Sequence, residues 1–296
     1  MTRLAVLSDI HGNLPALEAV LCDLAQFSVD QVIVAGDVIN WGPFSAQVVQ
    51  RITREGWTVM RGNHEFYLLD QQTPRALPEW DDVSSFPLLP WLHRQLNGSW
   101  QDVIDGWPDT VCLHSPDAPP LSVFHGSPMN PRDPIYPTTT EDEIQTLFAG
   151  VDETFLVTGH THLAMDRRVG RWRVLNPGSV GVPLDGKLSA GYMLLDGDAA
   201  GWRPSFRRVP FDYGPLFREF ERQHFLDECG VVGRLVLEEF ETARAWLYPF
   251  LHWRHAICPE APLTMSLLEE FAKVDPRGYM PEPYRRFWID VRAIPV

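Results

Sequence analysis

Five short apolar runs in this sequence each end in a polar motif that contains aspartate, asparagine or histidine. In chain order the motifs are SDIHGN, AGDVINWGP, RGNHE, FHGSP and TGHTH, and each stands where a strand-like run gives way to a loop. In open α/β sheets the loops that follow parallel strands converge on one crevice. The sequence therefore predicts that the polar side chains of these motifs share one site. They are Asp9, His11, Asp37, Asn63, His64, His125, His160 and His162.

The first 65 residues alternate strand-like and helical patterns. The strand-like runs are RLAVLS, QVIVAG and WTVMRG, and the two segments between them carry apolar residues at helical spacing. Asn13 can cap the first helix, and Gly56 can close the second. This order of elements predicts a βαβαβ unit with a parallel sheet.

The middle of the chain is less regular. Residues 66 to 110 contain five prolines and short helical pieces such as PWLHRQL, which predict an insertion or lid. Strand-like runs return between residues 121 and 209 in a hairpin-rich series, and this predicts more antiparallel pairing.

After Pro210 the pattern becomes helical. Apolar residues recur at helical spacing, at Val232, Leu235, Val236, Phe240, Ala243 and Leu247. We therefore expect a core over residues 1–210 with an insertion at about 66–110, and a helical C-terminal extension over 211–296. The favoured interpretation of the extension is a cover that packs on the core. The alternative is a contact between copies of the chain in a homo-oligomer.

Composition narrows the classes of partner. The chain has 296 residues, 45% of them hydrophobic, which is enough for a sizeable core. Its formal net charge of −14 argues against broad nucleic-acid or anionic-membrane binding, because both depend on lysine and arginine. No apolar run approaches the roughly 20 residues of a membrane span. The four cysteines lie far apart and the first motif follows the N-terminus closely, so the expected location is the cytoplasm.

The chemistry of the eight polar groups points to divalent metals. Carboxylate, imidazole and amide oxygen together suit borderline divalent ions, whereas an all-oxygen set indicates Mg or Ca and thiolates indicate structural zinc. Eight groups exceed the needs of one ion. Two ions roughly 3.5 to 4 Å apart, bridged by one carboxylate, would use all but one of them and form a clamp for a phosphoryl group.

The motifs D-x-H, GD, GNH[DE], H and GH-x-H, in this order, resemble those of the calcineurin-like metallophosphoesterases. The resemblance covers roughly residues 1–210. It implies an α/β fold in which two sheets form a sandwich flanked by helices, the αββα arrangement, and it leaves the helical extension outside. The activity it implies is hydrolysis of phosphoric esters that depends on two metal ions.

Position by position, the resemblance also implies a role for each side chain. It assigns Asp9, His11 and His162 to the first metal, Asn63, His125 and His160 to the second, and Asp37 to the bridge between them. His64 is left over and would face the leaving group as a cation or general acid. The implied mechanism is in-line attack by a hydroxide that bridges the metals. Mn is the expected metal, and Fe, Zn, Co, Ni or Mg suit ligands of this type.

Several neighbours of these motifs carry secondary expectations. Glu65 has two interpretations: a carboxylate that orients His64, or an exposed carboxylate at a helix start. Gly12 and Gly62 are expected in turns that bring the backbone close to the metals. The segment NPGSVG at 176–181 is expected to support the GHTH loop.

The substrate is expected to be a small phosphoester, either a phosphodiester or a phosphomonoester, and a nucleotide is one candidate. Protein phosphatases and symmetric dinucleoside tetraphosphate hydrolases usually carry arginine where this chain has Trp41, and an indole cannot replace the bidentate hydrogen bonds of a guanidinium. In this position the chain resembles the compact bacterial and archaeal phosphodiesterases, which also carry an aromatic residue there. Trp41, Arg132 and Asn13 are the candidate substrate contacts, with Tyr136 beside them.

Two other functions stay open at this point. One is a non-catalytic interaction scaffold on the same fold, which the complete set of ligand motifs disfavours. The other is a nuclease, which the acidic composition disfavours. A second metal site at His252, His255 and Cys258 is disfavoured because no fourth ligand stands out.

Overall fold

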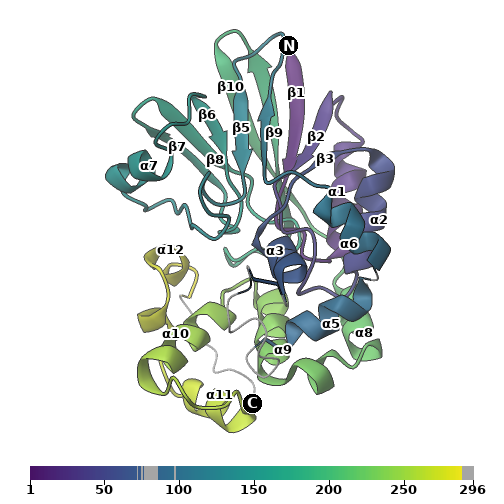
Figure 1. The fold of residues 1–296 in the computed structure, drawn as a ribbon, viewed down its shortest axis with the longest axis vertical. Helices are drawn as coiled ribbons and strands as arrows, with labels where there is room; N and C mark the ends of the chain where they lie inside the picture. Colours follow the sequence, from purple (N-terminus) through teal and green to yellow (C-terminus); the bar gives the residue numbers. More distant parts are fainter. Residues whose placement is uncertain (72, 75, 77–85, 97, 289–296) are drawn as a thin grey trace.

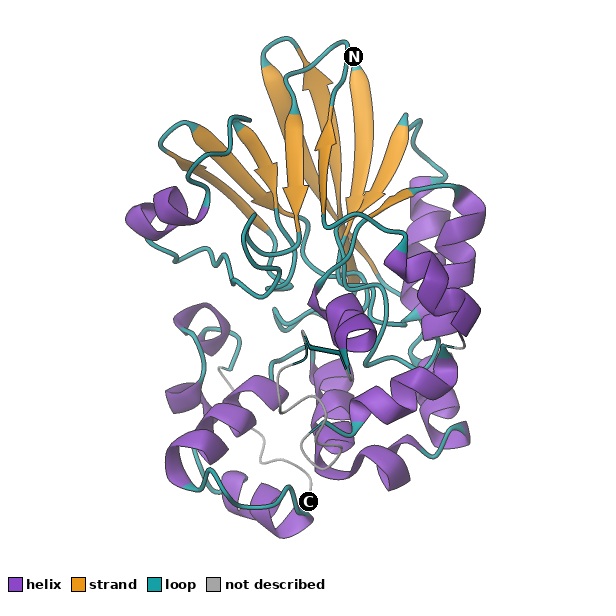
Figure 2. Ribbon diagram, viewed as in Figure 1, coloured by secondary structure: helices purple, strands orange, loops and turns teal. Residues whose placement is uncertain are grey.

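Two five-stranded sheets lie in the upper half of the molecule as it is drawn in Figures 1 and 2. The computed structural model describes the chain except for residues 72, 75, 77–85, 97 and 289–296. The first sheet has the strand order β10-β9-β1-β2-β3, and the second has the order β4-β5-β6-β8-β7.

The first sheet is built from the two ends of the core sequence. Its strands are β1 (Thr2–Leu7), β2 (Gln31–Val34), β3 (Thr58–Val59), β9 (Ala190–Asp198) and β10 (Gly201–Val209). β1, β2 and β3 pair in parallel, as the sequence predicts for a βαβαβ unit. β1 pairs antiparallel with β9 on its other side, so it lies in the middle of the sheet.

The second sheet mixes parallel and antiparallel pairs. Its strands are β4 (Thr110–Leu113), β5 (Leu121–Phe124), β6 (Phe155–Val157), β7 (Met165–Val169) and β8 (Trp172–Asn176). β5, β6 and β8 are parallel, while β4 and β7 pair antiparallel at the two edges. The two edge strands are not predicted by the sequence analysis.

Alternation along β1 explains why the sheets form a sandwich. Leu4 and Val6 share a buried cluster with Val123 and Val157 of the second sheet, so the two sheets pack face to face. Ala5 and Leu7 point to the opposite side of the first sheet.

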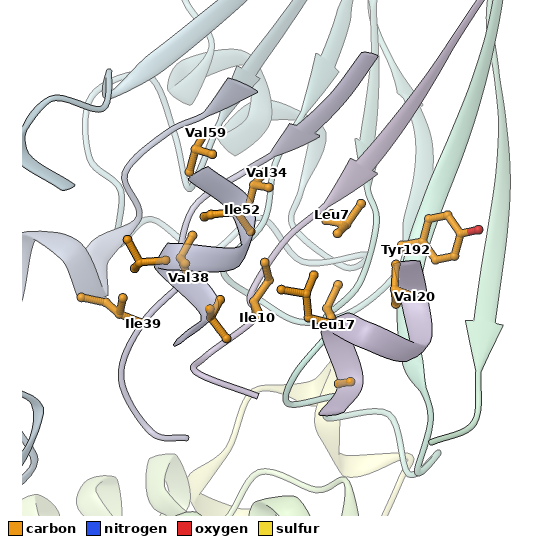
Figure 3. Close-up of a cluster of buried hydrophobic side chains, with 14 of the residues drawn as sticks. Leu7, Ile10, Leu17, Val20, Val34, Val38, Ile39, Ile52, Val59 and Tyr192 are labelled. Carbon is orange, nitrogen blue, oxygen red and sulfur yellow. The ribbon is translucent and has the colours of Figure 1, made fainter. Parts of the chain in front are cut away.

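The helices α1 (Leu14–Leu24) and α2 (Ser45–Glu55) cover that opposite side. Figure 3 shows Leu7 of β1 gathered with Leu17, Val20 and Ile52 of these helices. The predicted cap is present, since Asn13 Oδ1 accepts a hydrogen bond from Ala16 N at 3.1 Å.

The middle of the chain contributes further helices. They are α3 (Asn63–Asp70), α5 (Leu88–Gln95), α6 (Gly98–Asp105) and α7 (Glu141–Leu147). Leu92 and Ile104 join the cluster under α1 and α2, and Ile144 of α7 packs on the outer face of the second sheet. The layers are therefore αββα, as expected. Part of the predicted lid, residues 77–85, lies outside the described residues.

The expected helical extension is present. Its helices are α8 (Gly214–Arg222), α9 (Phe225–Thr242), α10 (Leu247–Ile257), α11 (Met265–Phe271), the 3-10 helix η1 (Pro276–Tyr279) and α12 (Glu282–Arg285). The apolar spacing from Val232 to Leu247 does not lie on one helix. α9 ends at Thr242, and the next residue, Ala243, has a φ of 51°. The described part of the chain holds no helix with the length and hydropathy of a membrane span.

The extension lies beyond the loop end of both sheets (Figure 1). Its buried cluster includes Leu235 and Phe240 of α9 together with Leu163, Val182 and Leu184 of the core loops. The helices thus pack on the same loops that carry the polar motifs.

Candidate metal centre

All eight predicted side chains meet at the loop end of the sandwich. Asp9 and His11 follow β1, and Asp37 follows β2. Seven of the eight are buried, and His160 is half-buried. The other members of the set are Asn63 and His64 after β3, His125 after β5, and His162 after β6.

One group of potential ligand atoms surrounds Asp9. His162 Nε2 lies 3.3 Å from Asp9 Oδ1, and His11 Nε2 lies 3.2 Å from His162 Nε2. His11 Nε2 is 4.0 Å from the same Asp9 oxygen. A carboxylate oxygen and two imidazole nitrogens therefore face one small space, the arrangement predicted for a first metal.

A second group surrounds Asn63. His125 Nε2 lies 3.0 Å and His160 Nδ1 lies 2.8 Å from Asn63 Oδ1. Asp37 stands between the groups, because its Oδ2 atom is 3.1 Å from His125 Nε2 and 3.7 Å from His11 Nε2. Asp37 is thus placed where a bridging carboxylate would lie.

The chemistry of the donor set fits divalent cations. Asp9 is fully buried, and its Oδ2 atom has no hydrogen-bond partner among the described residues. A buried carboxylate oxygen without a partner is unfavourable, and a cation held between Asp9, His11 and His162 would supply the missing interaction. Mixed nitrogen and oxygen donors are those that Mn, Fe, Zn, Co and Ni accept.

Burial and neighbouring charges together determine the protonation of these histidines. Burial lowers the pKa of His160 to about 3, so this ring is neutral at pH 7 and offers a lone pair. Burial alone would also lower the pKa of His125, but the adjacent Asp37 carboxylate raises it to about 10. A metal ligand must be deprotonated, so a metal ion held at the Asn63 group would displace the proton of His125.

Backbone carbonyls orient two of the imidazoles. His125 Nδ1 donates a hydrogen bond to Ala35 O at 2.8 Å, and His162 Nδ1 donates to Val182 O at 2.5 Å. A carbonyl can only accept, so each ring carries its proton on Nδ1 and turns Nε2 toward the site. Such outer partners fix the tautomer of a metal-ligating histidine.

The Glu65 side chain binds the backbone of the loop that carries Asp37. The structure shows that Glu65 is fully buried, so its interpretation as an exposed carboxylate is wrong. Its Oε2 atom accepts hydrogen bonds from the amides of Gly62 and Asp37, and Oε1 accepts from those of Val38 and Ile39. Glu65 therefore ties the loop that carries Asp37 to the turn that precedes Asn63.

Two glycines allow the loops to approach one another. A Cβ atom on Gly62 would lie 2.3 Å from Asp37 Oδ1, and one on Gly12 would lie 2.6 Å from Gly42 O. A side chain at either position would therefore clash with the neighbouring loop. The loop at 176–181 also supports the GHTH motif, because Asn176 Nδ2 donates to Gly159 O at 2.7 Å.

The candidate substrate contacts behave differently from one another. The Asn13 side-chain amide makes hydrogen bonds within the protein: its oxygen caps α1, and its nitrogen donates to Gly181 O at 2.8 Å. Trp41 stacks on His11 with ring centroids 4.5 Å apart. Arg132 is exposed, and it lines a pocket beside the histidines together with Trp41 and Tyr136.

The same pocket has a wall that the sequence analysis did not predict. Glu239, Tyr248, Leu251 and Tyr284 of the extension line it. Of these, only Glu239 carried a signal in the sequence: it falls three and four residues after Val236 and Leu235, on the apolar face of α9, where a charged residue is unusual. His252, His255 and Cys258 belong to none of the potential metal groups among the described residues.

Comparison with known proteins agrees with the geometry. Residues 2–200 match the calcineurin-like phosphoesterase superfamily domain. Phosphodiesterase YfcE of Escherichia coli is 29% identical over 208 residues, which cover 67% of this chain and 89% of YfcE. An uncharacterized protein of Methanocaldococcus jannaschii is 25% identical over 244 residues, which cover 77% of this chain and 96% of that protein.

Solved structures share the fold. A metallophosphoesterase of Sphaerobacter thermophilus superposes with a TM-score of 0.64 at 23% identity, over 82% of this chain and 99% of that one. A hypothetical protein of Pyrococcus horikoshii gives a TM-score of 0.66 at 19% identity, over 76% of this chain and 94% of that one. With its five motifs gathered at one end of an αββα sandwich, this chain belongs to the calcineurin-like phosphoesterase superfamily, in its compact bacterial and archaeal branch, and is a metal-dependent phosphoric ester hydrolase.

Proposed function

We propose that the protein is a dinuclear phosphoesterase that hydrolyses a phosphodiester or a small phosphomonoester by in-line attack of an activated water. The observation that carries this proposal is the position of Asp37 between two groups of ligand atoms, 3.1 Å from His125 Nε2 and 3.7 Å from His11 Nε2. The similarity to a protein named phosphodiesterase supports the diester as substrate class.

We assign one metal ion to the group of side chains around Asp9 and the other to the group around Asn63. Asp9, His11 and His162 hold the first ion, Asn63, His125 and His160 hold the second, and Asp37 is shared. When bound, the ions would supply Lewis-acid chemistry, lowering the pKa of a water and neutralising charge on the phosphoryl oxygens. Mn is the proposed metal.

His64 is proposed to act on the leaving group. Asn40 Oδ1 accepts a hydrogen bond from Trp41 N at 2.8 Å, which turns Asn40 Nδ2 toward His64 Nδ1 at 2.9 Å. Because an amide nitrogen donates, His64 Nδ1 accepts, and the proton of the neutral ring is on Nε2. His64 Nε2 lies 3.9 Å from Asp37 Oδ2, so this N–H is directed at the site. The neutral ring can donate a hydrogen bond to the departing oxygen and stabilise its developing charge.

The test is hydrolysis of bis-p-nitrophenyl phosphate and p-nitrophenyl phosphate by metal-stripped protein that is resupplied with Mn, Ni, Zn or Mg. We expect turnover only with metal. Asp37→Asn should lose both bound metal and turnover, because the shared carboxylate is gone. His64→Ala should keep its metal content and lose turnover by about 100-fold or more.

The matched controls are Asp152→Asn and His114→Ala, which change exposed side chains outside the site. Both should keep metal content and rate. If metals bind and neither ester nor a panel of nucleotides is hydrolysed, the scaffold interpretation replaces the enzymatic one. Equal rates in His64→Ala and the native protein would contradict the role of His64.

A further inference from the structure

The pocket beside the metal centre is closed on one side by the extension. It has a volume of about 400 Å³, within the usual range for small-molecule sites, and it reaches His64, His160 and His162. The residues that the extension contributes are Glu239, Ala245, Leu247, Tyr248, Leu251 and Tyr284. A phosphoryl group held at the metal centre would therefore place its organic substituent against these side chains.

The wall of this pocket is aromatic and apolar. Trp41 and Tyr67 of the core line it together with Leu247, Tyr248 and Leu251 of α10. Among the described lining residues the cationic side chain is Arg132, at the exposed edge. This composition suits a compact planar group, because a long polyanion would require a cationic groove.

The apolar wall continues past the pocket. A second cavity of about 220 Å³ is lined by Trp41, Tyr67 and Leu251 again, and also by Phe86 and Val232. The shared residues make the two cavities neighbours. The organic group thus has room to extend along an apolar surface away from the metal centre.

Glu239, which lines the pocket, has one buried oxygen atom without a hydrogen-bond partner among the described residues. Glu239 is 2% exposed, and its Oε1 atom accepts hydrogen bonds from Trp246 N at 2.8 Å and Leu247 N at 2.9 Å. Its Oε2 atom has no hydrogen-bond partner among the described residues. Because a buried carboxylate oxygen is costly when unpaired, its place in the pocket wall indicates a ligand group that donates to it.

We infer that the extension is the binding site for the organic part of the substrate, and that this part is an aromatic ring that carries an N–H or O–H donor for Glu239. The inference rests on the proposed function, since it assumes that the metal centre holds the phosphoryl group. It assigns substrate selection to residues outside the five motifs.

The test is a calorimetric titration of the Mn-loaded full chain with methylphosphonate, benzylphosphonate and 4-aminobenzylphosphonate. The three probes share one head group and contain no leaving group, so differences in affinity report the organic part. We expect benzylphosphonate to bind about ten-fold tighter than methylphosphonate, through burial of the ring. The amino group should add about three-fold through Glu239.

Two variants separate the two contacts. Leu251→Gln should reduce the benzyl preference at least about five-fold. Leu226→Gln changes a similarly exposed leucine of the extension that lies outside this pocket, and it should keep the preference. Glu239→Gln keeps an oxygen for the backbone amides of Trp246 and Leu247 but presents NH₂ to the ligand. It should remove the preference for the amino group and leave the benzyl preference unchanged.

Hydrolysis of bis-p-nitrophenyl phosphate by the same samples separates this inference from the proposed function. Metal-dependent turnover with equal affinity for the methyl and benzyl probes would overturn the inference and leave the proposed function intact. A benzyl preference that survives in Leu251→Gln would also overturn it. Absence of both metal-dependent turnover and metal-dependent phosphonate binding would overturn the proposed function itself.

Discussion

At the scale of single residues, the backbone and the ligand chemistry make the same demand on the sequence. Asp9, His11, Asp37, His160 and His162 all have positive φ, between 47° and 66°. This left-handed region is sterically unfavourable for most residues, but aspartate, asparagine and histidine enter it several-fold more often than the rest. The residue types that bind metals are thus also types that these tight loops tolerate, and a β-branched replacement would lose both properties.

Asn40 offers a test of how His64 is held. The structure places the His64 proton on Nε2 because Asn40 donates to Nδ1. In Asn40→Asp the carboxylate can only accept, so the Nδ1 proton is retained and the pKa of His64 rises from about 4, where burial now holds it. Nε2 then carries a proton only in the cationic ring.

The expected result is a pH profile for kcat with a new descending limb at neutral to alkaline pH, as His64 loses its proton. The native protein should lack this limb, because its neutral ring already carries the Nε2 proton. Asn40→Ala is the comparison: it removes the hydrogen bond without adding charge, so its rate should fall without a new limb. Identical profiles for Asn40→Asp and the native protein would contradict the assigned tautomer.

Glu65 provides a second prediction at this scale. Glu65→Gln leaves one acceptor oxygen for four backbone amides and turns an NH₂ toward the remaining donors. We expect a loss of about 2 to 4 kcal/mol in the free energy of unfolding, with weaker metal binding at Asp37. Glu143→Gln is the matched control, because Glu143 is also the third residue of a helix and accepts from Thr140 N at 2.8 Å, but it is exposed. Chemical denaturation should show less than about 1 kcal/mol of loss there.

The contrast between Asp37 and Glu65 shows what the sequence can predict at single positions. Asp37 follows a recognisable strand in a fixed motif, so its place at the site could be predicted from spacing. The role of Glu65 depends on the loop after β2 folding over the start of α3, a tertiary contact that no local pattern encodes. Its two interpretations could be separated only by its burial.

At the scale of elements, α9 buries the acid Glu239 beside the apolar residues Leu235, Val236 and Phe240. Burial raises the pKa of Glu239 from 4.5 to about 7. Below pH 4.5 this group is neutral in the folded and the unfolded chain, and its contribution to stability is fully present. As pH rises toward 7, the unfolded chain ionises first, so unfolding releases a proton and the folded state loses stability.

At about 1.36 kcal/mol per pKa unit, this loss amounts to about 3 kcal/mol between pH 4.5 and 8. Glu239→Gln should remove that component, so the difference in unfolding free energy between native protein and variant should change by this amount over the range. Glu241→Gln, an exposed position on the same helix, should follow the native protein at every pH. A difference independent of pH would show that Glu239 does not titrate in this interval.

The elements themselves were unevenly predictable. Strands with continuous apolar runs, such as β1 and β2, were clear in the sequence, and so were the amphipathic helices between them. The edge strand β7 has the sequence MDRRV, in which three charged residues conceal the two buried ends. The break after α9 was hidden because Ala243 and Leu247 keep the apolar spacing across a left-handed residue.

At the scale of the whole molecule, a hydrogen bond joins the extension to the loop that carries the proposed ligands His160 and His162. Tyr284, next to the end of the described chain, donates its hydroxyl to Thr161 O at 2.9 Å, between His160 and His162. Tyr284→Phe removes this contact and keeps the ring. Because outer contacts orient ligands, we expect metal affinity to fall by about ten-fold.

Competition with a fluorescent chelator would measure this change, and Tyr279→Phe in η1 is the control. Unaltered affinity in Tyr284→Phe would mean that the extension packs on the loop without influencing it. The sequence analysis favoured packing of the extension on the core, and the shared apolar cluster agrees. That the packed helices also wall the pocket could not be foreseen, because helical periodicity reports which face is buried and not what lies beneath it.

The order of strands in the first sheet determines when each pair of strands can form during synthesis of the chain. β1 pairs on one side with β2, which follows it closely, and on the other with β9, which begins at Ala190. At translation rates of about 5 to 20 residues per second, β9 is synthesised roughly 10 to 40 s after β1. During this time one edge of β1 has no strand to pair with. Every histidine of the metal centre has left the ribosome by then. The nascent chain therefore holds its complete set of candidate ligands before the sheet that positions them can close.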